Sequence, residues 1–360
     1  MHTDRPGPWV VLSQTDQRRW GGDLRRHHVM RQLVIRTAAA AVPGLDRPAV
    51  RDSTRRAAGR PWPWRTRPRL ASSELLTPGA VVLARRMTRP VAVDLHDHVI
   101  AQADALGRAV SDEYRVAQTS RIAANLELFP WVVVPSASFA DLVGLDPGRV
   151  IVAPNGSETD HVQPRPVQDP PGIGFASGAA PGRGIEALVA AARLVHAEVP
   201  DLRLYLWLAA VDGPSEAYVE GLRQACAADP WVIIGGVPYG ELSGALARAR
   251  VLVVPHPANA YLDVAVPIKL IDSMAAGRPV VVTPRVETRR IVEAAQAGLV
   301  TADDSPAAIA AAVTTLLGDA DLAARLGHNG RTAAVRDYDW RVIGDRVADA
   351  VLERAGEGVR

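Results

Sequence analysis

The sequence predicts an α/β protein built from two Rossmann-like, doubly wound domains that face each other across a cleft. Short apolar runs alternate with helical segments along most of the 360 residues, as in parallel sheets covered by helices. The alternation is interrupted by a proline-rich segment at residues 164–171, which is typical of a linker. A chain of this length with 48% hydrophobic residues can bury two cores.

The predicted first domain comprises residues 1–164. It opens with an apolar strand at 9–12, followed by the loop Gly21-Gly22 and a helix whose apolar face contains Met30, Leu33 and Val34. Further buried strands are expected at the apolar runs 81–84, 90–95, 131–134 and 150–153. Residues 38–75 are rich in Arg and Pro and show little periodicity, so no element is predicted there.

The predicted second domain comprises residues 165–336, where the alternation is clearer. Strands are expected at 172–176, 202–208, 231–234, 251–255 and 279–283, and helices at 184–198, 215–228, 239–248, 268–276 and 287–296. Open parallel sheets bind ligands at the carboxyl ends of their strands, so we expect the active site at these ends, between the domains.

Charge is distributed unevenly along the chain. Residues 1–90 contain 18 Arg and 6 acidic residues, a local balance of +12 in a chain of net charge +2. A basic first domain can attract an anionic acceptor or a membrane face, and the aromatic and basic segment 61–67 fits either a surface loop or such a contact. No nucleic-acid-binding module is recognisable. No apolar run reaches about 18 residues, so we expect a cytoplasmic protein that can associate peripherally with membranes.

Two positions are suited to a nucleoside diphosphate. Gly21-Gly22 lie between a predicted strand and a predicted helix, where backbone N–H groups can approach a phosphate, although an ordinary tight turn has the same pattern. Arg183 lies just before a predicted helix, where its guanidinium can neutralise the charge of a departing diphosphate or remain a solvated surface group.

Lys269 and Asp272 are three residues apart on a predicted helix and share a face. A carboxylate near the helix N-terminus can accept both ribose hydroxyls of a nucleotide. Lys269 is the single lysine among 41 basic residues, which favours a role for a compact ammonium group.

Five motifs in order resemble the GT-B fold glycosyltransferases, close to the retaining family 4 (glycosyl transferases group 1). They lie at residues 133–136, 154–156, 182–188, 236–242 and 267–281. The resemblance also covers Tyr338-Asp339-Trp340 and the helical run after it, and implies a segment 337–360 that crosses back to the first domain.

The resemblance implies a hexosyltransferase that moves a sugar from a nucleoside-diphosphate sugar to an unknown acceptor hydroxyl, with retention and without a metal or other cofactor. The residues that it implies for the donor site are Gly21, Gly22, Asn155, Arg183, Gly184, Lys269 and Asp272. Arg183 would also be catalytic.

The sequence departs from the family at three positions. Gly178 occupies the place of a second basic residue, Val264 that of a glutamate, and Asp272 that of another glutamate. The alternative is therefore a pseudo-glycosyltransferase, or a non-catalytic nucleotide-sugar-binding protein of the same fold. A nicotinamide-dependent oxidoreductase is disfavoured because neither domain opens with a full Gly-x-Gly-x-x-Gly motif.

His96 follows a predicted strand within Asp94-Leu95-His96-Asp97-His98. The resemblance places a histidine here beside the transferred sugar, where it would be a catalytic residue that bonds a hydroxyl or helps the acceptor lose its proton. Alternation along an extended segment puts Asp94, His96 and His98 on one side, so a metal cluster and a structural role remain open alternatives.

Overall fold

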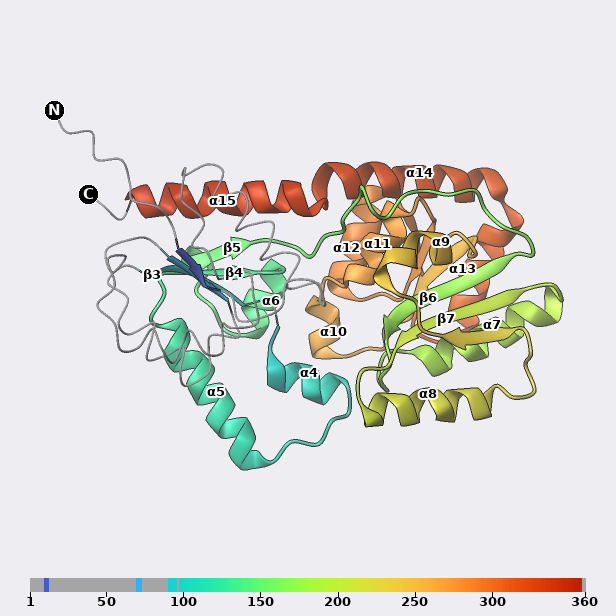
Figure 1. Ribbon diagram of the computed structural model, residues 1–360, viewed down its shortest axis with the longest axis horizontal. Helices are drawn as coiled ribbons and strands as arrows, with labels where there is room; N and C mark the ends of the chain where they lie inside the picture. The colour runs from blue at the N-terminus through green and yellow to red at the C-terminus, as the bar shows by residue number, and fades with distance from the viewer. Residues whose placement is uncertain (1–9, 13–68, 73–89, 96, 358–360) are drawn as a thin grey trace. The chain divides into compact units, whose positions relative to one another are not determined.

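The computed structural model describes residues 10–12, 69–72, 90–95 and 97–357, which form two compact units (Figure 1). Unit 1 comprises the described residues within Met1–Gln102, Ala109–Asn155 and Trp340–Arg360, and unit 2 comprises Ala103–Arg108 and Gly156–Asp339. The main crossings between the units are thus at 155/156 and 339/340, and the proline-rich segment 164–171 lies within unit 2.

Unit 1 contains a parallel sheet of five strands in the order β1-β2-β3-β4-β5. The strands are β1 (Val10–Leu12), β2 (Arg69–Ser72), β3 (Pro90–Asp94), β4 (Trp131–Val134) and β5 (Val150–Val152). All of them except β2 coincide with predicted strands. The predicted strand at 81–84, the Gly21-Gly22 loop and the helix that contains Met30 lie outside the described residues.

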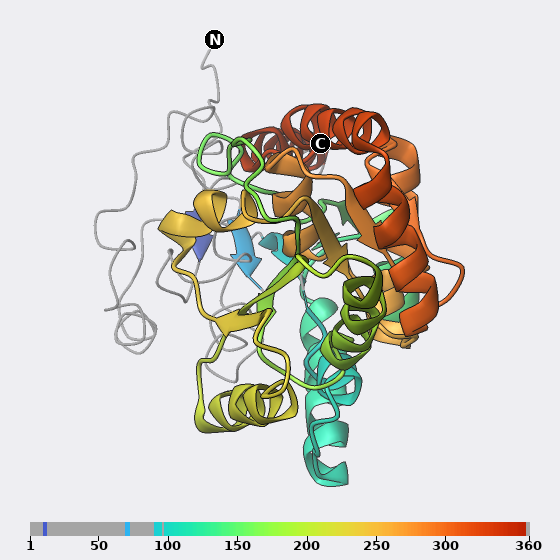
Figure 2. The same cartoon turned by 90° about the vertical axis from the view of Figure 1, so that its right-hand side faces the viewer.

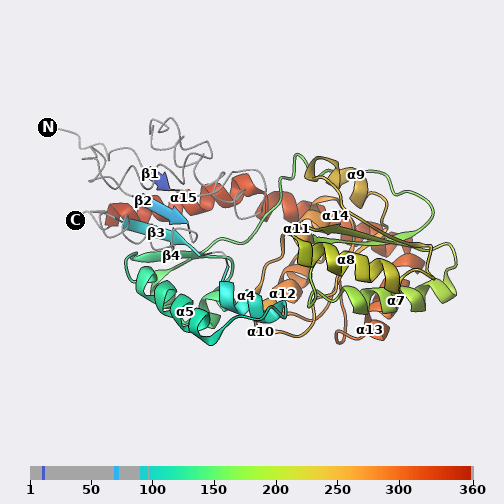
Figure 3. The same ribbon diagram turned by 60° about the horizontal axis from the view of Figure 1, so that its bottom comes forward.

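Helices flank this sheet on both sides. Figures 1 and 3 show α15 running along one side of it and α5 on the opposite side. The helices that belong to unit 1 wholly or in part are α4 (Val99–Ala105), α5 (Asp112–Leu126), α6 (Ala137–Leu142) and α15 (Trp340–Glu357), with the 3-10 turn η2 (Pro147–Arg149) before β5. Trp340, Ile343 and Val347 of α15 are buried, and α15 packs against β3.

Unit 2 contains a parallel sheet of six strands in the order β11-β10-β9-β6-β7-β8. The strands are β6 (Gly172–Gly178), β7 (Arg203–Ala209), β8 (Val232–Gly235), β9 (Val251–Val254), β10 (Val280–Val282) and β11 (Gly298–Val300). From β6 the chain adds β7 and β8 on one side, and then β9, β10 and β11 on the other. The strand order therefore reverses between β6 and β9, which is the point where doubly wound sheets bind ligands.

The two faces of this sheet are covered by separate layers of helices (Figures 1 and 2). One face packs on α7 (Ile185–Glu198), α8 (Gly213–Ala225) and α13 (Pro306–Gly318), and the other on α9 (Leu242–Leu246), α11 (Ile268–Ala275), α12 (Val286–Ala295) and α14 (Ala320–Asp337). Strand residues alternate between the two cores: Leu204 and Leu206 enter the first, whereas Tyr205 and Trp207 enter the second. This alternation explains why both faces of a buried strand are apolar.

The predicted elements of unit 2 are largely confirmed, with one exception. The single helix expected at 239–248 is instead the 3-10 turn η3 (Tyr239–Glu241) followed by α9. The short elements α10 (Ala260–Val264) and β11, and the helices α13 and α14, were not predicted.

Among the described helices, none is alone long and apolar enough to cross a membrane. Helices α13 and α14 meet the length and composition requirements only as a pair, across a bend of 102°.

Candidate active site

The carboxyl ends of β6 and β9 bring several polar residues of unit 2 together. Ser177 is the penultimate residue of β6, and His256 lies two residues beyond the end of β9. Lys269, in the first turn of α11, contacts both side chains. The reversal of strand order thus coincides with a polar site, as expected for a doubly wound domain.

The loop between β6 and α7 has a backbone that only glycine accommodates at two positions. Gly182 and Gly184 have φ of 75° and 77°, in the left-handed region. A Cβ atom at Gly184 would lie 1.7 Å from the carbonyl oxygen of Pro255, the residue after β9. This loop therefore lies directly against the end of β9, and it holds the half-buried Arg183 between the two glycines.

Helix α7 begins immediately after this loop, and no side chain caps its N-terminus. The first N–H groups of a helix have no partner within the helix, and together with the helix dipole they favour an anion. The N-terminus of α7 follows the carboxyl end of β6, so the position suits a phosphate group.

Lys269 is partly buried and has no carboxylate among its described contacts. Its Nζ donates to Ser177 Oγ at 2.9 Å and lies 3.1 Å from His256 Nε2, and it is 4.9 Å from the centre of the Phe175 ring. Burial of the ammonium group, and next the positive charge of Arg183, lower the pKa of Lys269 well below its ordinary value. An anion bound here would oppose this shift.

His256 is buried, with 2% of its surface exposed. Its pKa is lowered by burial first and then by the positive charges of Lys269, Arg183 and Arg285. Arg183, His256 and Lys269 therefore form a group of neighbouring basic side chains, which we call the basic cluster. A buried histidine beside a lysine, with further positive charge near both, favours an anionic ligand.

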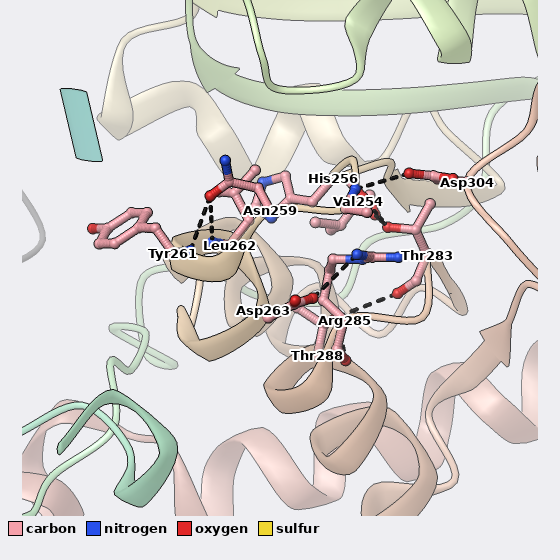
Figure 4. Close-up of polar contacts among 11 residues, drawn as sticks. Val254, His256, Asn259, Tyr261, Leu262, Asp263, Thr283, Arg285, Thr288 and Asp304 are labelled. Carbon is pink, nitrogen blue, oxygen red and sulfur yellow. Dashed lines mark hydrogen bonds and ion pairs between the residues drawn. The ribbon is translucent and has the colours of Figure 1, made fainter. Parts of the chain in front are cut away.

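Backbone and side-chain contacts fix the loop that presents His256 (Figure 4). Thr283, just after β10, donates from Oγ1 to the His256 carbonyl oxygen at 2.5 Å, and Asp304 Oδ2 accepts from the Ala258 amide at 2.8 Å. The Asn259 side chain caps α10 by accepting from the amides of its first turn. These contacts hold the backbone of the loop, whereas His256 Nδ1 is buried without a hydrogen-bond partner in the described part of the chain.

Arg285 lies near His256 but already has an acidic partner. Its Nη1 lies 3.1 Å from Oδ1 of Asp263 on α10 (Figure 4). The Arg285 side chain is only 9% exposed and that of Asp263 34%, so loss of Asp263 would leave a buried guanidinium without this partner, which is costly. Arg285 therefore ties α10 to the start of α12 and contributes positive potential near His256.

Asp272 lies on α11 with different neighbours from those of Lys269. It is buried, and its Oδ1 has no hydrogen-bond partner in the described part of the chain. Burial raises its pKa to about 7; the Ser157 hydroxyl opposes this shift and Glu158 adds to it. A buried carboxyl oxygen without a partner is suited to accept a ligand hydroxyl.

The aromatic rings near Asp272 are stacked on each other. His161 and Tyr239 have ring centroids 4.9 Å apart, and the Tyr239 carbonyl lies 2.9 Å from His161 Nε2. Burial first, and then the charges of Asp272 and Glu158, raise the pKa of the Tyr239 hydroxyl above its ordinary range. Tyr239 therefore stays protonated at neutral pH.

The structure brings Arg183, Gly184 and Lys269 together at one end of the unit 2 sheet, with Asp272 one turn further along α11. Asn155, half-buried just after β5, is the last residue of its segment of unit 1. Gly21, Gly22 and His96 lie outside the described residues.

The structure describes the surroundings of two positions at which the sequence departs from the family pattern, Gly178 and Val264. A Cβ at Gly178 would meet no atom within 4 Å, so the end of β6 has room for a side chain there. Val264, in contrast, is 8% exposed and belongs to the core.

Two residues close to His96, Asp97 and His98, form hydrogen bonds with the first turns of α4. The His98 ring accepts from the Ala101 amide at 3.2 Å, and Asp97 accepts from the Gln102 side chain at 3.1 Å, both at the start of α4. Across the described positions, no three His, Cys, Asp or Glu side chains are grouped as metal ligands would be.

Sequence reasoning missed Ser177 and His256 as site residues. Their position is the signal that could have found them, since each lies at the carboxyl end of a predicted buried strand, where ligands bind. The strand at 251–255 was predicted, but His256 just after it was not considered.

A comparison with protein families matches residues 170–319 to the family described as Glycosyl transferases group 1. The chain is 29% identical over 218 residues to the GDP-mannose-dependent alpha-(1-6)-phosphatidylinositol monomannoside mannosyltransferase of Mycolicibacterium smegmatis, a match that covers 56% of each protein. The enzyme of the same name from Mycobacterium tuberculosis is 28% identical over 213 residues and 54% of each chain. The chain therefore spans about half the length of the curated relatives that it matches.

Solved structures match nearly the whole chain. The Anabaena protein HepE in complex with UDP and glucose has a TM-score of 0.69 at 16% identity, over 96% of this chain and 99% of that one. A glycosyltransferase from Rickettsia africae has a TM-score of 0.67 at 12% identity, over 96% and 97%. Sucrose-phosphate synthase from Thermosynechococcus elongatus has a TM-score of 0.62 at 19% identity, over 81% and 74%.

These structural matches and the two parallel, helix-covered sheets confirm the predicted fold class. The chain has the GT-B fold of glycosyltransferases, and its residues 170–319 match the Glycosyl transferases group 1 family.

Proposed function

We propose that this protein is a glycosyltransferase that moves a sugar from a nucleoside-diphosphate sugar to an acceptor hydroxyl. The observation that carries the proposal is the basic cluster at the reversal of strand order in unit 2, beside the uncapped N-terminus of α7. Neighbouring lysine, histidine and arginine side chains and helix N–H groups are together suited to a diphosphate.

The donor nucleotide would lie along α11. Lys269 would face the diphosphate, and Asp272, one turn further along, would accept the ribose hydroxyls through its buried oxygen. The distance between a diphosphate and its ribose is short enough for two residues on one helix face to reach both. Arg183 would bind the phosphates from the α7 side, and Gly184 lets this loop lie against Pro255 at the end of β9. Gly21, Gly22 and Asn155 are proposed further donor contacts.

The chemistry needs no protein nucleophile in this proposal. The acceptor oxygen forms a bond to the anomeric carbon on the face from which the diphosphate leaves, and the acceptor proton passes to a diphosphate oxygen. Arg183, Lys269 and the α7 N-terminus stabilise the charge that develops on the leaving group. The configuration at the anomeric carbon is then retained, and the proposal assigns no step to a metal.

The names of the relatives suggest which donors to test. The mycobacterial relatives are described as GDP-mannose-dependent, and HepE was solved with UDP and glucose and with UDP-glucose. The acceptor of the mycobacterial relatives is a phosphatidylinositol mannoside, and an acceptor at a membrane surface agrees with the basic first domain. His96 is proposed to contact the transferred sugar.

Calorimetric titration with UDP and GDP, followed by assays of UDP-glucose and GDP-mannose turnover, tests the proposal. We expect one nucleotide to bind and its sugar conjugate to be turned over, slowly to water and faster to a suitable acceptor, with activity retained in EDTA. Failure of both nucleotides to bind would contradict the proposal.

A second candidate function is a binding protein without transferase activity. It is favoured by Gly178 and Val264, which leave one cation and one carboxylate fewer than the family pattern. Tight nucleotide-sugar binding with no hydrolysis and no transfer would support this second function.

A further inference from the structure

Two aromatic side chains near Asp272, those of His161 and Tyr239, form a stack that we call the aromatic pair. Their ring centroids are 4.9 Å apart, and the ring planes are inclined by 24°. Tyr239 is 39% exposed, and His161 is also exposed. One exposed aromatic residue is ordinary on a protein surface, so the position of this pair decides what it can do.

Tyr239 lies at the ligand-binding edge of the unit 2 sheet. Strand β8 ends at Gly235, and Tyr239 follows four residues later as the first residue of η3. Strands β6, β7, β8 and β9 are all parallel, so the end of β8 lies at the same edge as the ends of β6 and β9. Doubly wound domains bind their ligands at this edge.

The backbone that carries the aromatic pair is held by several contacts within unit 2. His161 Nε2 lies 2.9 Å from the Tyr239 carbonyl oxygen. Two residues further on, Gln163 accepts from Ser243 Oγ through its carbonyl oxygen at 2.8 Å and donates to the same Oγ through its amide at 3.0 Å. Arg331 donates to two further backbone carbonyls of this segment at 2.9 and 3.0 Å. A surface that is already ordered binds a ligand at a lower entropic cost.

The aromatic pair is a neighbour of the proposed ribose site. Asp272 and Glu158 act electrostatically on the Tyr239 hydroxyl, and His161 acts on Asp272. Asp272 is 7% exposed, and its Oδ1 has no hydrogen-bond partner among the described residues. In a nucleotide the base is attached to the ribose carbon next to the one that carries the 2′-hydroxyl. A ribose held at Asp272 therefore brings its base close to the aromatic pair.

We propose that the aromatic pair binds the nucleobase of the donor, which stacks on the exposed part of the Tyr239 ring while His161 supports the ring from its other face. The inference rests on the proposed function, because the ribose at Asp272 brings the base to this position. Every base has a π-face, so such stacking adds affinity without selecting one base. The base takes no part in the reaction, so Tyr239 contributes equally to binding of the substrate and of the transition state.

Two substitutions at Tyr239 separate ring stacking from other contacts. Tyr239→Phe removes the hydroxyl and keeps the ring, whereas Tyr239→Leu removes the hydroxyl and the ring but remains apolar. Calorimetric titration of the full chain with UDP and with GDP measures the affinity. For the nucleotide that binds, Tyr239→Leu should raise the Kd by about tenfold or more, the usual cost of losing a stacked ring. Tyr239→Phe should stay close to the wild-type protein.

Steady-state kinetics with the corresponding nucleotide sugar give a second measurement. Tyr239→Leu should raise KM and leave kcat nearly unchanged, because loss of uniform binding has this effect. The matched control is Tyr114→Leu on α5 of unit 1, where the tyrosine is 42% exposed. It should change neither nucleotide affinity nor KM. Circular dichroism and melting temperature establish that the three variants are folded.

Two kinds of result would overturn the inference, and they are distinguishable. If folded Tyr239→Leu binds the nucleotide as tightly as the wild-type protein, or if Tyr239→Phe loses as much affinity as Tyr239→Leu, the base does not stack on this ring and the proposed function still stands. An equal loss in Tyr114→Leu leads to the same conclusion. Failure of UDP and GDP to bind the wild-type protein overturns both.

Discussion

Arg183 is held between two glycines with positive φ and acts electrostatically on two other basic residues. We expect Arg183→Ala to lower turnover on the order of 10²-fold, the usual loss when one donor to a developing negative charge is removed. Its melting temperature should change little because the side chain is only half-buried. Steady-state kinetics with the donor identified by titration measure the loss.

Arg183→Lys is the control, because it keeps the charge but loses the planar fork of the guanidinium. It should retain more activity than Arg183→Ala. A decrease of less than tenfold in the alanine variant, with unchanged donor affinity, would show that Arg183 does not bind the leaving diphosphate.

Asp272 is destabilising when it is ionised in the folded protein. Its folded pKa of about 7 exceeds the ordinary value of 3.8, so between these pH values the folded state binds more protons than the unfolded state. Stability therefore falls as pH rises from 3.8 to about 7 and is level above it. The cost at alkaline pH is at most about 4 kcal/mol, at 1.36 kcal/mol per unit.

Asp272→Asn should accordingly raise the free energy of unfolding of the unliganded protein at about pH 8 by a few kcal/mol, and by less at lower pH. The same variant should bind the nucleotide more weakly if the carboxylate accepts the ribose hydroxyls. Urea titrations across this pH range measure the first effect and calorimetry the second. A stability difference that does not vary with pH would mean that the Asp272 pKa is not raised.

The candidate site residues that the sequence predicts in unit 2 lie in local motifs. Arg183 lies between two glycines before a helix, and Lys269 lies in the motif at 267–281. His256 and Ser177 have no motif of their own, because what brings them together is the adjacency of β6 and β9. That adjacency depends on strand order, which a local pattern does not specify.

At the scale of elements, the loop from β6 to α7 depends on glycine at some positions and not at others. A Cβ at Gly184 would lie 1.7 Å from the Pro255 carbonyl oxygen, and φ there is 77°. Gly184→Ala must therefore displace the loop or the end of β9. We expect it to cost several kcal/mol in unfolding free energy, as strain at such a position typically does, and to weaken nucleotide binding.

Gly178, at the end of β6, provides the matched control. It has ordinary φ, and a Cβ there would meet nothing within 4 Å. Gly178→Ala should change unfolding free energy and nucleotide affinity little. Chemical denaturation and calorimetry of the two alanine variants make the comparison, and equal effects at Gly178 and Gly184 would contradict the close approach of the loop to β9.

The same open space allows a gain of function to be tested. Gly178→Arg places a second cation where the sequence resemblance to GT-B glycosyltransferases implies a basic residue. If the diphosphate lies at the end of β6, this variant should bind the nucleoside diphosphate more tightly, with a larger loss of affinity in high salt. Calorimetry at two salt concentrations measures the affinity of the variant and of the wild-type protein for the nucleotide. An unchanged or weaker affinity in the variant would mean that the diphosphate does not lie at the end of β6.

The elements that the sequence predicted well are those with long apolar runs, such as β6, β7 and β9. Strand β2 was missed because Arg69 and Ser72 are among its four residues and its surroundings are rich in Arg and Pro. The helix expected at 239–248 is instead η3 followed by the short helix α9. Gly240 lies within η3 and Gly244 within α9, and glycine weakens a helix. Strand β11 is a three-residue segment, Gly298–Val300, too short to show a period.

At the scale of the whole molecule, the chain leaves unit 1 and returns to it. Helix α15 belongs to unit 1, where its buried Trp340, Ile343 and Val347 contribute to the core. The two large hydrophobic clusters around the β6–β11 sheet lie wholly within residues 156–339. Each unit therefore has its own sheet, and the C-terminal helix is needed by the first unit.

We therefore expect thermal unfolding to occur in two transitions, because each unit has apolar contacts of its own. A nucleoside diphosphate that binds the basic cluster should raise the transition of unit 2. Ligand at 100 times its dissociation constant adds about 2.7 kcal/mol to the stability of the state that binds it. Scanning calorimetry with and without the nucleotide identifies which transition moves.

Ile343→Asp assigns the other transition. It places a charge at a buried position of α15, which is strongly destabilising without a partner. This variant should lower or abolish the unit 1 transition while the unit 2 transition still rises with nucleotide. A single transition that moves as a whole with either the ligand or the substitution would mean instead that the two units unfold cooperatively.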